Sequence, residues 1–369
     1  MEMKRLKDIA THFDLRGNVL EVNSLGDGLI NDTYLVHTDG DDDYVLQRIN
    51  DSIFRDVELL QRNIEYVTSH IRSRLESSGT DGIDRKVLEF IRVKGSSRTY
   101  VYDDSSYWRM SRFIKNSVTV TEVTPESSRC AGKAFGEFQA MLADIPYHIG
   151  ETIPDFHNME LRARQLEEAV KADSAGRCAE PQVQQLLEEM NNYMFQMCKA
   201  ERMHREGILP KRICHCDTKV SNMLFDKDGG TLCVIDLDTV MPSFIFSDYG
   251  DFLRTAANPV AEDSTEFDKV EFDMDIYYAF TEGYLQAVSV FLTDVEKDNL
   301  PYAAALFPFM QAVRFLTDYI NGDTYYKTAY KDHNLVRTLN QMTLFRSIVK
   351  SLKLELRDHK YPNNSLLIP

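Results

Sequence analysis

The hydrophobic and polar positions along the chain change their period once. Residues 19–113 contain short runs that alternate or are rich in β-branched residues, a pattern typical of strands. The runs expected to form strands are 18–25, 32–38, 42–49, 86–93, 98–103 and 106–114. One segment among them, 54–76, has its apolar residues at helical spacing. We therefore expect a small β-rich lobe with one helix, spanning residues 1–115.

From about residue 125 the apolar positions follow a helical period. The segments 125–145 and 181–204 each carry an apolar face, and residues 266–356 continue the helical pattern. A short β insert interrupts this region, with strands expected at 222–225 and 231–238. The sequence thus predicts an α+β chain whose second lobe, residues 116–369, is mainly helical.

Composition narrows the class of protein. The 42 basic and 58 acidic side chains give a formal net charge of −16, which argues against nucleic-acid or anionic-membrane partners. The most apolar stretch, 302–316, is too short and too polar to span a bilayer, and the N-terminus has no signal-like apolar run. We expect a cytoplasmic protein with reduced cysteines, whose oligomeric state the sequence leaves open.

Polar residues with a shared chemistry flank the β insert. Asp217 lies on the loop before it, and a tight hairpin over 222–235 would bring Asn222 and Asp236 to neighbouring strand ends. An amide oxygen and a carboxylate suit Mg²⁺ bound to a polyphosphate. Asp217 would then accept the proton of a substrate hydroxyl, which is the division of roles that phosphoryl transfer needs. His215 is expected to support the loop.

The run of Cys214, His215 and Cys216 invites a different interpretation, a zinc or redox site. Zinc needs four ligands, and adjacent residues of an extended segment point in opposite directions. We therefore interpret both cysteines as small apolar side chains of the loop.

The segments "HCDTKVSN" (215–222) and "IDLD" (235–238) resemble the paired motifs of the aminoglycoside phosphotransferase family. These small-molecule kinases have a bilobal, protein-kinase-like fold. The resemblance implies ATP and Mg²⁺ as cofactors, Asp217 as catalytic base, and Asn222 and Asp236 as metal ligands. It implies that Asp248 braces the catalytic loop, and it leaves Asp238 to assist the metal or face the substrate. Cys216 stands where the family often has glycine.

The same resemblance assigns the nucleotide site. Gly26 and Gly28 match the phosphate loop, and Arg48 takes the place of the lysine that pairs with the phosphates. A surface strand charge is the alternative role of Arg48. Its carboxylate partner would be Asp56 or Glu58. Apolar packing and backbone hydrogen bonds to adenine are expected from the strand that contains Met110, Phe113 and Ile114.

Further segments resemble one subfamily, the N-acetylhexosamine 1-kinases: "IPDFHN", "VIDLDTVMP", "DYGDFLR" and "VRFLTDYINGDTYYKT". Arg314 and Asp318 share a helix face at i, i+4, and Tyr325 follows in the next loop. The resemblance implies that Arg314 and Tyr325 bind the sugar, with Asp318, Tyr319 and Asp323 as lesser candidates. A surface salt bridge beside a packed tyrosine is the alternative.

Three other functions compete with this one. A kinase of the same family could phosphorylate another alcohol, such as an aminoglycoside, choline, homoserine or a different sugar. A nucleotide-binding regulator without turnover is disfavoured because Asp217, Asn222 and Asp236 are all present. A purely structural protein would leave this polar set unexplained.

Overall fold

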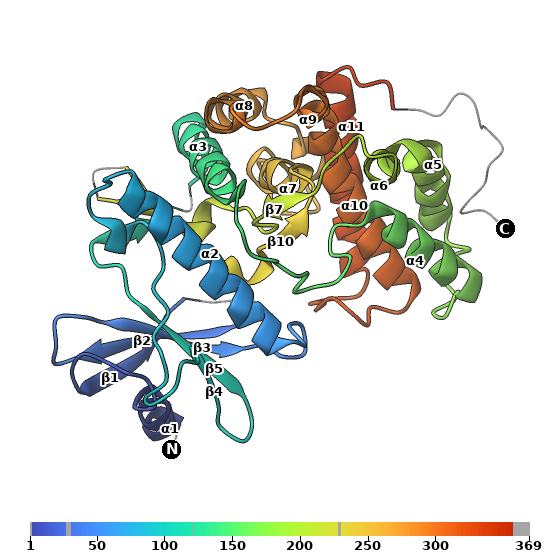
Figure 1. Cartoon of the computed structure of the whole chain (residues 1–369). Helices are drawn as coiled ribbons and strands as arrows, with labels where there is room; N and C mark the ends of the chain where they lie inside the picture. The colour runs from blue at the N-terminus through green and yellow to red at the C-terminus, as the bar shows by residue number, and fades with distance from the viewer. Residues whose placement is uncertain (1, 27–30, 121, 228–229, 357–369) are drawn as a thin grey trace. The chain divides into compact units, whose positions relative to one another are not determined.

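The computed structural model describes residues 2–26, 31–120, 122–227 and 230–356 (Figure 1). Its contacts divide the chain into two compact units with interleaved segments. The first unit comprises Met1–Val120, Met141–Pro154 and Ser221–Met241; the second comprises Thr121–Ala140, Asp155–Val220 and Pro242–Pro369. The sequence pattern predicts a single division at residue 115, whereas two later segments, Met141–Pro154 and Ser221–Met241, pack with the first unit.

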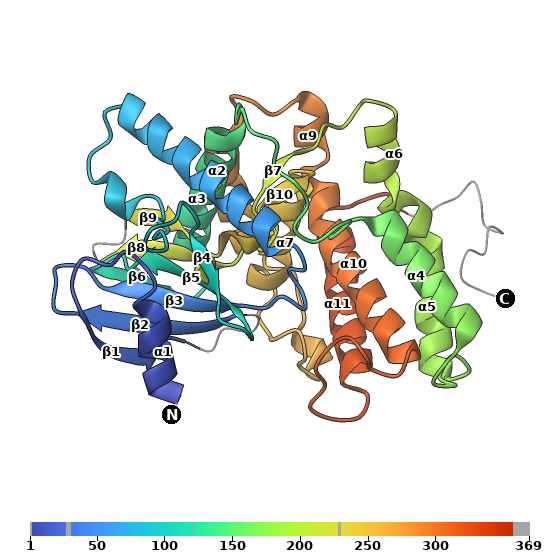
Figure 2. The same cartoon turned by 60° about the horizontal axis from the view of Figure 1, so that its bottom comes forward.

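A five-stranded antiparallel sheet forms the centre of the first unit, with the strand order β1-β2-β3-β5-β4. Its strands are β1 (Val19–Ser24), β2 (Asp32–Thr38), β3 (Tyr44–Ile49), β4 (Tyr100–Tyr102) and β5 (Tyr107–Arg112). Helices α1 (Glu2–Ala10) and α2 (Val57–Ser77) lie on opposite sides of this sheet (Figures 1 and 2). The apolar side chains of α1 pack with one face of the sheet, because strand residues alternate and Leu46, Trp108 and Met110 all point to that side.

The strand expected at 86–93 is absent. This segment follows a short 3₁₀ turn, Ile83–Arg85, and forms only two isolated bridges, Phe13↔Val93 and Phe90↔Ser111. Strand β3 pairs along one edge of β5, and β4 occupies the first half of the other edge. Only the end of β5 is left for this segment, which is too short a partner for a regular strand.

The expected hairpin of the β insert is confirmed. Strands β8 (Met223–Asp226) and β9 (Thr231–Val234) pair antiparallel, and β6 (Ser117–Thr119) joins them on the outer side of β8. Part of the turn, residues 228–229, lies outside the described residues. A 3₁₀ turn, Val220–Asn222, precedes the hairpin, and another, Leu237–Thr239, follows it.

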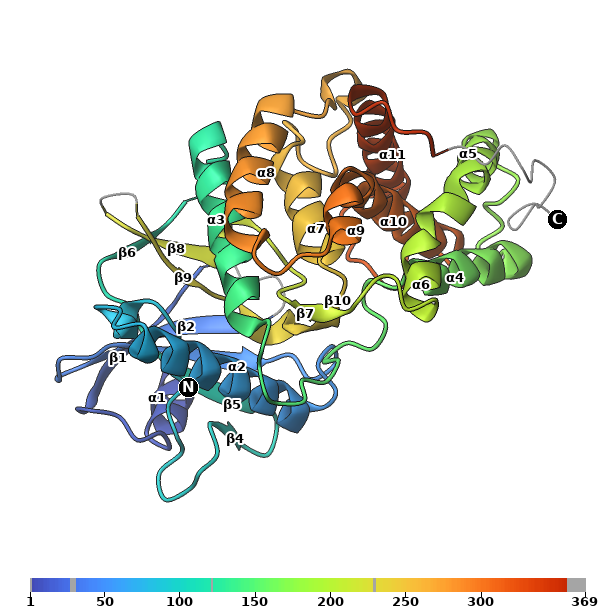
Figure 3. The same cartoon turned by 45° about the horizontal axis from the view of Figure 1, so that its top comes forward.

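Helices dominate the second unit, as the sequence predicted (Figure 3). They are α3 (Pro125–Leu142), α4 (Met159–Ala172), α5 (Pro181–Met197), α6 (Lys199–Arg205), α7 (Phe246–Ala256), α8 (Met274–Val288), α9 (Asp294–Asp298), α10 (Leu300–Ile320) and α11 (His333–Ser351), with a 3₁₀ turn at Phe267–Lys269. Helix α10 is buried along most of its length and packs against α11, α7 and α4. A two-stranded sheet, β7 (Arg212–Cys214) with β10 (Met241–Ser243), ends at the loop that carries Asp217. No described helix is long and apolar enough to cross a membrane.

A buried ion pair attaches the segment after the hairpin to the sheet of the first unit. Arg109 of β5 points away from the α1 side, is 2% exposed, and pairs through Nη1 with Asp238 Oδ1. Asn31 Nδ2 donates to the other carboxylate oxygen over 2.6 Å, and Thr152 Oγ1 donates to the Asp238 carbonyl over 2.8 Å. Arg109 Nε donates to Gln47 Oε1 over 2.9 Å. Both charges are therefore fully enclosed by polar partners, which a buried ion pair requires.

We predict that Arg109→Met lowers the free energy of unfolding by about 3–5 kcal/mol, because it leaves the Asp238 charge buried without its counter-ion. Urea unfolding followed by the fluorescence of Trp108, the single tryptophan, measures this. Arg5→Met is the matched control, since Arg5 forms an exposed ion pair with Asp103 and should cost less than about 1 kcal/mol. Equal losses in the two variants would contradict the role assigned to the buried pair.

Candidate functional site

The loop that carries Asp217 begins where β7 ends. His215 is fully buried, and its ring packs edge-on against Phe135 and Phe138 with centroid separations of 5.5 and 5.9 Å. Its Nδ1 accepts a hydrogen bond from the backbone N–H of Asp217 over 3.3 Å. His215 thus fixes the backbone at Asp217 while its own ring is enclosed by aromatic side chains.

One buried carboxylate holds this loop. Asp248, in the first turn of α7, accepts hydrogen bonds from the backbone N–H groups of His215 (2.9 Å) and Cys216 (2.7 Å) and from Gln139 Nε2 (2.7 Å). Burial raises the pKa of Asp248, and these hydrogen bonds oppose that shift. Gln139 is in turn oriented by the Tyr284 hydroxyl, which donates to its Oε1 over 2.6 Å. Asp248 therefore fixes the backbone of the loop before Asp217.

The backbone at Cys216 explains why glycine suits this position. Its φ is +64°, in the left-handed region that costs a residue with a Cβ roughly 1–2 kcal/mol. The hydrogen bond to Asp248 stabilises this conformation. Burial raises the pKa of the Cys214 and Cys216 thiols well above the ordinary value, so both are neutral. The described residues contain no cluster of three His, Cys, Asp or Glu side chains arranged for a metal.

Lys219 is a site residue that the sequence reasoning missed. Its Nζ lies 2.7 Å from Asp217 Oδ1, and the backbone N–H of the intervening Thr218 donates to Asp251 Oδ2 over 3.1 Å. The charge of Asp217 raises the pKa of Lys219 against the opposing effect of burial, which is the larger single influence. A lysine two residues after the candidate base was the signal available in the sequence. The pair places a cation directly beside the carboxylate.

Asn222 and Asp236 lie at the open end of the β8–β9 hairpin, in the first unit. The backbone N–H of Ile235 donates to the Asn222 carbonyl over 2.9 Å, and Met223 pairs with Val234. Asn222 is largely buried, whereas Asp236 is exposed and adopts a φ of +61°. An amide oxygen and an exposed carboxylate at one hairpin end fit the oxygen-only ligand preference of Mg²⁺. Asp238, two residues after Asp236, already has its carboxylate bonded to Arg109 and Asn31.

The residues expected to bind the phosphates of the nucleotide are Gly26, Gly28 and Arg48, with Asp56 or Glu58 as the partner of Arg48. Gly26 has a φ of +72° and open space where a Cβ would stand, and Gly28 lies outside the described residues. Arg48 is half-exposed and pairs with Asp32, its cross-strand neighbour. Asp56 instead caps α2, with Oδ1 accepting from the Leu59 N–H over 2.8 Å. Neither Asp56 nor Glu58 forms an ion pair with Arg48 in the described part of the chain.

The residues expected to contact adenine differ in their burial. Met110 is fully buried in the cluster between α1 and the sheet, and Ile114 is 5% exposed. Phe113 is half-buried, and its N–H donates to the Asp43 carbonyl over 2.8 Å. Met110 therefore contributes to the core of the first unit.

In the second unit, Asp318 organises the loop after α10. This buried carboxylate accepts hydrogen bonds from the backbone N–H groups of Thr324 (2.9 Å), Tyr325 (2.8 Å) and Tyr326 (3.0 Å), and from Asn334 Nδ2 (2.9 Å). Asp318 and Arg314 share a helix face as the spacing predicted, but they form no ion pair in the described ranges. Asp318 is instead used to fix the loop that presents the two tyrosines.

Arg314 lies between two aromatic rings. Its guanidinium carbon is 5.6 Å from the ring centroid of Phe156 and 5.6 Å from that of Tyr326, and Nη1 donates to Gln311 Oε1 over 3.1 Å. Tyr325 packs edge-on against Tyr326 and is 71% exposed. The cluster combines a fixed cation, apolar ring faces and an accessible hydroxyl, which is a set suited to a small polyhydroxylated molecule.

The other two lesser candidates, Tyr319 and Asp323, lie in a network that Asn334 joins to Asp318, since Asn334 Nδ2 donates to both aspartates over 2.9 Å. Asp323 pairs with Arg177 over 2.6 Å, and the same guanidinium lies 4.2 Å above the ring of Tyr319. The Tyr319 ring is buried, and its hydroxyl donates to Glu180 and Asp332 over 3.0 Å each. These contacts join the ends of α4, α5 and α10.

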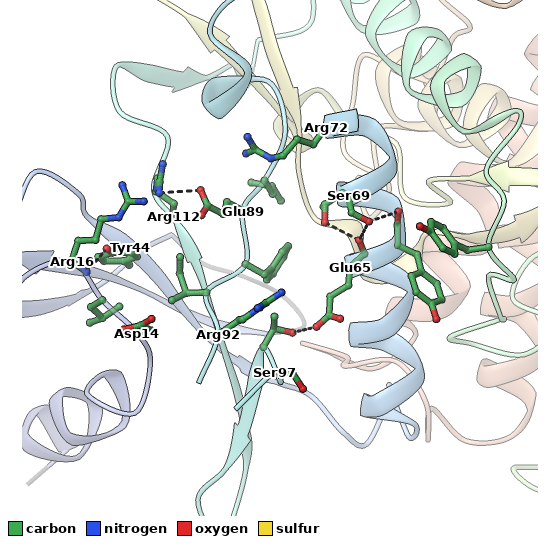
Figure 4. Close-up of a pocket in the computed structure, with 18 residues that line it drawn as sticks. Asp14, Arg16, Tyr44, Glu65, Ser69, Arg72, Glu89, Arg92, Ser97 and Arg112 are labelled. Atoms are coloured by element: carbon green, nitrogen blue, oxygen red, sulfur yellow. Dashed lines mark hydrogen bonds and ion pairs between the residues drawn. The ribbon is translucent and has the colours of Figure 1, made fainter. Parts of the chain in front are cut away.

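A polar cavity of about 740 Å³ lies in the first unit between α2 and the sheet (Figure 4). None of the site residues expected from the sequence lines it. Its arginines Arg72 and Arg112 are paired with Asp84 (2.9 Å) and Glu89 (3.0 Å). Three of the four arginines that line the cavity, Arg16, Arg72 and Arg112, therefore have carboxylate partners.

We predict that Asp248→Asn loosens the catalytic loop, because an amide places two N–H donors where the backbone N–H groups of His215 and Cys216 need acceptors. Hydrogen exchange followed by mass spectrometry should show clearly faster exchange in a peptide covering residues 212–220. Asp275→Asn, an exposed change on α8, is the control and should leave that peptide unchanged. Wild-type protection in Asp248→Asn would refute the bracing role.

Comparison with known proteins identifies the group to which this architecture belongs. A model of a phosphotransferase enzyme family matches residues 21–280. Among solved structures, an aminoglycoside phosphotransferase from Alicyclobacillus acidocaldarius superposes with a TM-score of 0.63 at 12% identity, covering 94% of this chain and 96% of its own. A choline kinase from Cryptosporidium parvum gives 0.60 at 13% identity, covering 96% and 98%.

A spectinomycin phosphotransferase in complex with ADP and spectinomycin gives a TM-score of 0.57 at 12% identity, covering 96% of this chain and 99% of its own. At such identities the similarity shows the fold, which is the kinase-like arrangement of a small antiparallel-sheet lobe and a helical lobe expected from the sequence. The family model spans well over half of the residues, so the chain belongs to the phosphotransferase enzyme family.

Proposed function

We propose that the protein transfers the γ-phosphoryl group of ATP to the anomeric hydroxyl of an N-acetylhexosamine, giving ADP and the sugar 1-phosphate. The observation that carries this proposal is the cluster that Arg314 and Phe156 form with Tyr325 and Tyr326, the two tyrosines of the loop fixed by Asp318. Aromatic faces pack against the apolar face of a sugar ring, and a guanidinium donates to hydroxyl and acetamide oxygens. The membership of the chain in a phosphotransferase family supplies the reaction class.

Asp217 is the proposed base. Its carboxylate accepts the proton of the anomeric hydroxyl while that oxygen forms a bond to the γ-phosphorus and the bond to ADP breaks. An anomeric hydroxyl is more acidic than an ordinary alcohol, so an unexceptional carboxylate suffices. The backbone of Asp217 is fixed by His215, and its carboxylate by Lys219, which lies 2.7 Å away.

Lys219 has a second proposed role. A cation beside the base faces the region where negative charge accumulates on the transferred group. In the free protein it pairs with Asp217. During the reaction it can donate to a phosphoryl oxygen without leaving the carboxylate, because an ammonium carries three N–H donors.

Asn222 and Asp236 are the residues that would hold Mg²⁺. When bound with ATP, this ion neutralises the charge of the phosphate oxygens. Asp238 is the proposed positioning residue for this end of the hairpin, since its carboxylate is already held by Arg109 and Asn31. The nucleotide contacts proposed for Gly26, Gly28, Arg48, Phe113 and Ile114 follow the family resemblance.

We predict that incubation with ATP, Mg²⁺ and N-acetylglucosamine or N-acetylgalactosamine gives a new anomeric phosphate doublet in the ³¹P NMR spectrum. The coupling to the anomeric proton identifies the phosphorylated position directly. Parallel reactions contain an aminoglycoside, choline, homoserine and glucose. Turnover of one of these with none of the N-acetylhexosamines would retain the phosphotransferase and reject this acceptor.

We predict that Asp217→Asn lowers kcat by about 10²–10⁴-fold, the usual contribution of a general base, with little change in the affinity for ATP. Steady-state kinetics and calorimetric ATP binding measure the two quantities separately. Asp294→Asn changes an exposed aspartate of the second unit and should leave both values unchanged. A parallel loss of turnover and ATP binding in Asp217→Asn would reject its role as base.

A further inference from the structure

Two arginines of the second unit contact the same residue of the proposed acceptor cluster: Arg162 donates to the carbonyl of Phe156, and Arg314 lies over its ring. Arg162 is in the first turn of α4, and Arg314 is on α10, the helix against which α4 packs. Burial lowers the pKa of Arg162 to about 10, and the charge of Arg314 is the second cause of this shift. The two guanidiniums therefore repel one another in a region with little water.

Neutral oxygens provide the hydrogen bonds of Arg162. Its Nη2 donates to the carbonyls of Asp155 (3.2 Å) and Phe156 (2.7 Å), and Nη1 donates to Gln165 Oε1 over 2.9 Å. Its Nε is buried and has no hydrogen-bond partner. Arg314 likewise donates to an amide oxygen, that of Gln311. Across the described residues, no carboxylate forms an ion pair with either guanidinium.

The surroundings compensate the two positive charges only in part, since Asp155 supplies the one carboxylate that favours the charged form of Arg162 among the causes of its pKa shift. His157 lies beside the pair, and burial, followed by the charges of Arg314, Arg162 and Arg254, holds its pKa well below the ordinary value. The imidazole is therefore neutral, with Nδ1 bonded to Ser247 Oγ over 3.0 Å. The Asp155 carboxylate accepts from Asn158 and affects the pKa of Arg162 less than Arg314 does.

Other arginines in comparable settings do have counter-ions. Arg254 is bonded to both Asp251 and Glu262. In the cavity of the first unit, Arg112 is paired with Glu89 (Figure 4), and Arg72 is paired with Asp84. The excess positive charge at Arg162 and Arg314 is thus a local property of this site.

A partly buried pair of like charges is unfavourable until a ligand supplies negatively charged oxygen, and guanidiniums bind carboxylates with good geometry. We propose that Arg162 and Arg314 together bind an oxyanion, the carboxylate of the acceptor. The preferred acceptor is then an N-acetylated sugar acid. This inference rests on the proposed function for its reaction, and it adds Arg162 and a charged substituent to the recognition of the acceptor.

The test compares acceptors that share the anomeric hydroxyl and the acetamide but differ in charge. N-acetylglucosamine is the neutral member, and its 3-O-lactyl ether (N-acetylmuramic acid) and its C6 carboxylate (N-acetylglucosaminuronic acid) are the acids. We expect at least one acid to have a kcat/KM at least 10-fold above that of the neutral sugar. A preference of the wild-type enzyme for the neutral sugar over both acids would overturn the proposal.

Variants connect this preference to the two arginines. Arg162→Gln and Arg314→Gln should each lower the acid-to-neutral ratio of kcat/KM by at least 10-fold. Arg162→Lys, which keeps the charge but loses the planar fork, should lower it less and guards against a folding defect. Arg205→Gln is the control, because Arg205 is exposed on α6 and paired with Glu160, and its ratio should match the wild type. Unchanged ratios in both glutamine variants would reject the site.

Calorimetric binding separates this inference from the proposed reaction. In one outcome no sugar is phosphorylated, but the acid still binds the wild type and does not bind the glutamine variants. This result would support the oxyanion site and reject the proposed kinase reaction. Inorganic phosphate is titrated in parallel at equal ionic strength. Binding of phosphate that depends on both arginines, with no binding of the acids, would assign the site to a free anion and reject the acceptor carboxylate.

Discussion

A buried carboxylate must receive hydrogen bonds or a counter-ion on every side, and this constraint fixes each segment of the candidate site. Asp238, Asp248 and Asp318 are each less than 5% exposed. Asp248 accepts hydrogen bonds from backbone N–H groups of the loop before Asp217, and Asp318 accepts them from the loop that contains Tyr325. Asp238 attaches the end of the hairpin to Arg109 in the sheet. In each case the buried aspartate positions residues that are more accessible than itself.

This arrangement has a physical advantage over positioning by apolar packing. Short loops have few apolar side chains, so their backbone N–H groups need polar acceptors when they are covered. One carboxylate can accept several such bonds and therefore sets several backbone positions at once. It can also maintain a conformation that costs energy on its own, as at Cys216, whose N–H lies 2.7 Å from Asp248 Oδ1. Rigid loops then present Asp217 and Tyr325 with little conformational entropy to lose on binding.

The sequence predicted what depends on local pattern and missed what depends on distant partners. Hydrophobic period located the β8–β9 hairpin and helices such as α2, α3 and α5, and the family resemblance singled out Asp248. The segment 86–93 has a strand-like pattern, but β4 already occupies half of the edge it would need. The partner of Asp238 is Arg109, which is 129 residues away, so no spacing rule could reveal it. The ion pair of Arg48 with Asp32 on the neighbouring strand was not predicted either, and the phosphate role of Arg48 stays a prediction.

Net charge illustrates the same difference between global and local information. The chain carries 16 more acidic than basic side chains, yet within the described residues no carboxylate forms an ion pair with Arg162 or Arg314. Charges in a buried region interact strongly, because little solvent screens them. Charges on the surface are screened by solvent and salt. The sign of a binding region therefore follows from which charges lack partners. Arg72 and Arg112 in the cavity of the first unit have carboxylate partners, whereas the hydrogen bonds of Arg162 and Arg314 in the second unit go to uncharged oxygens.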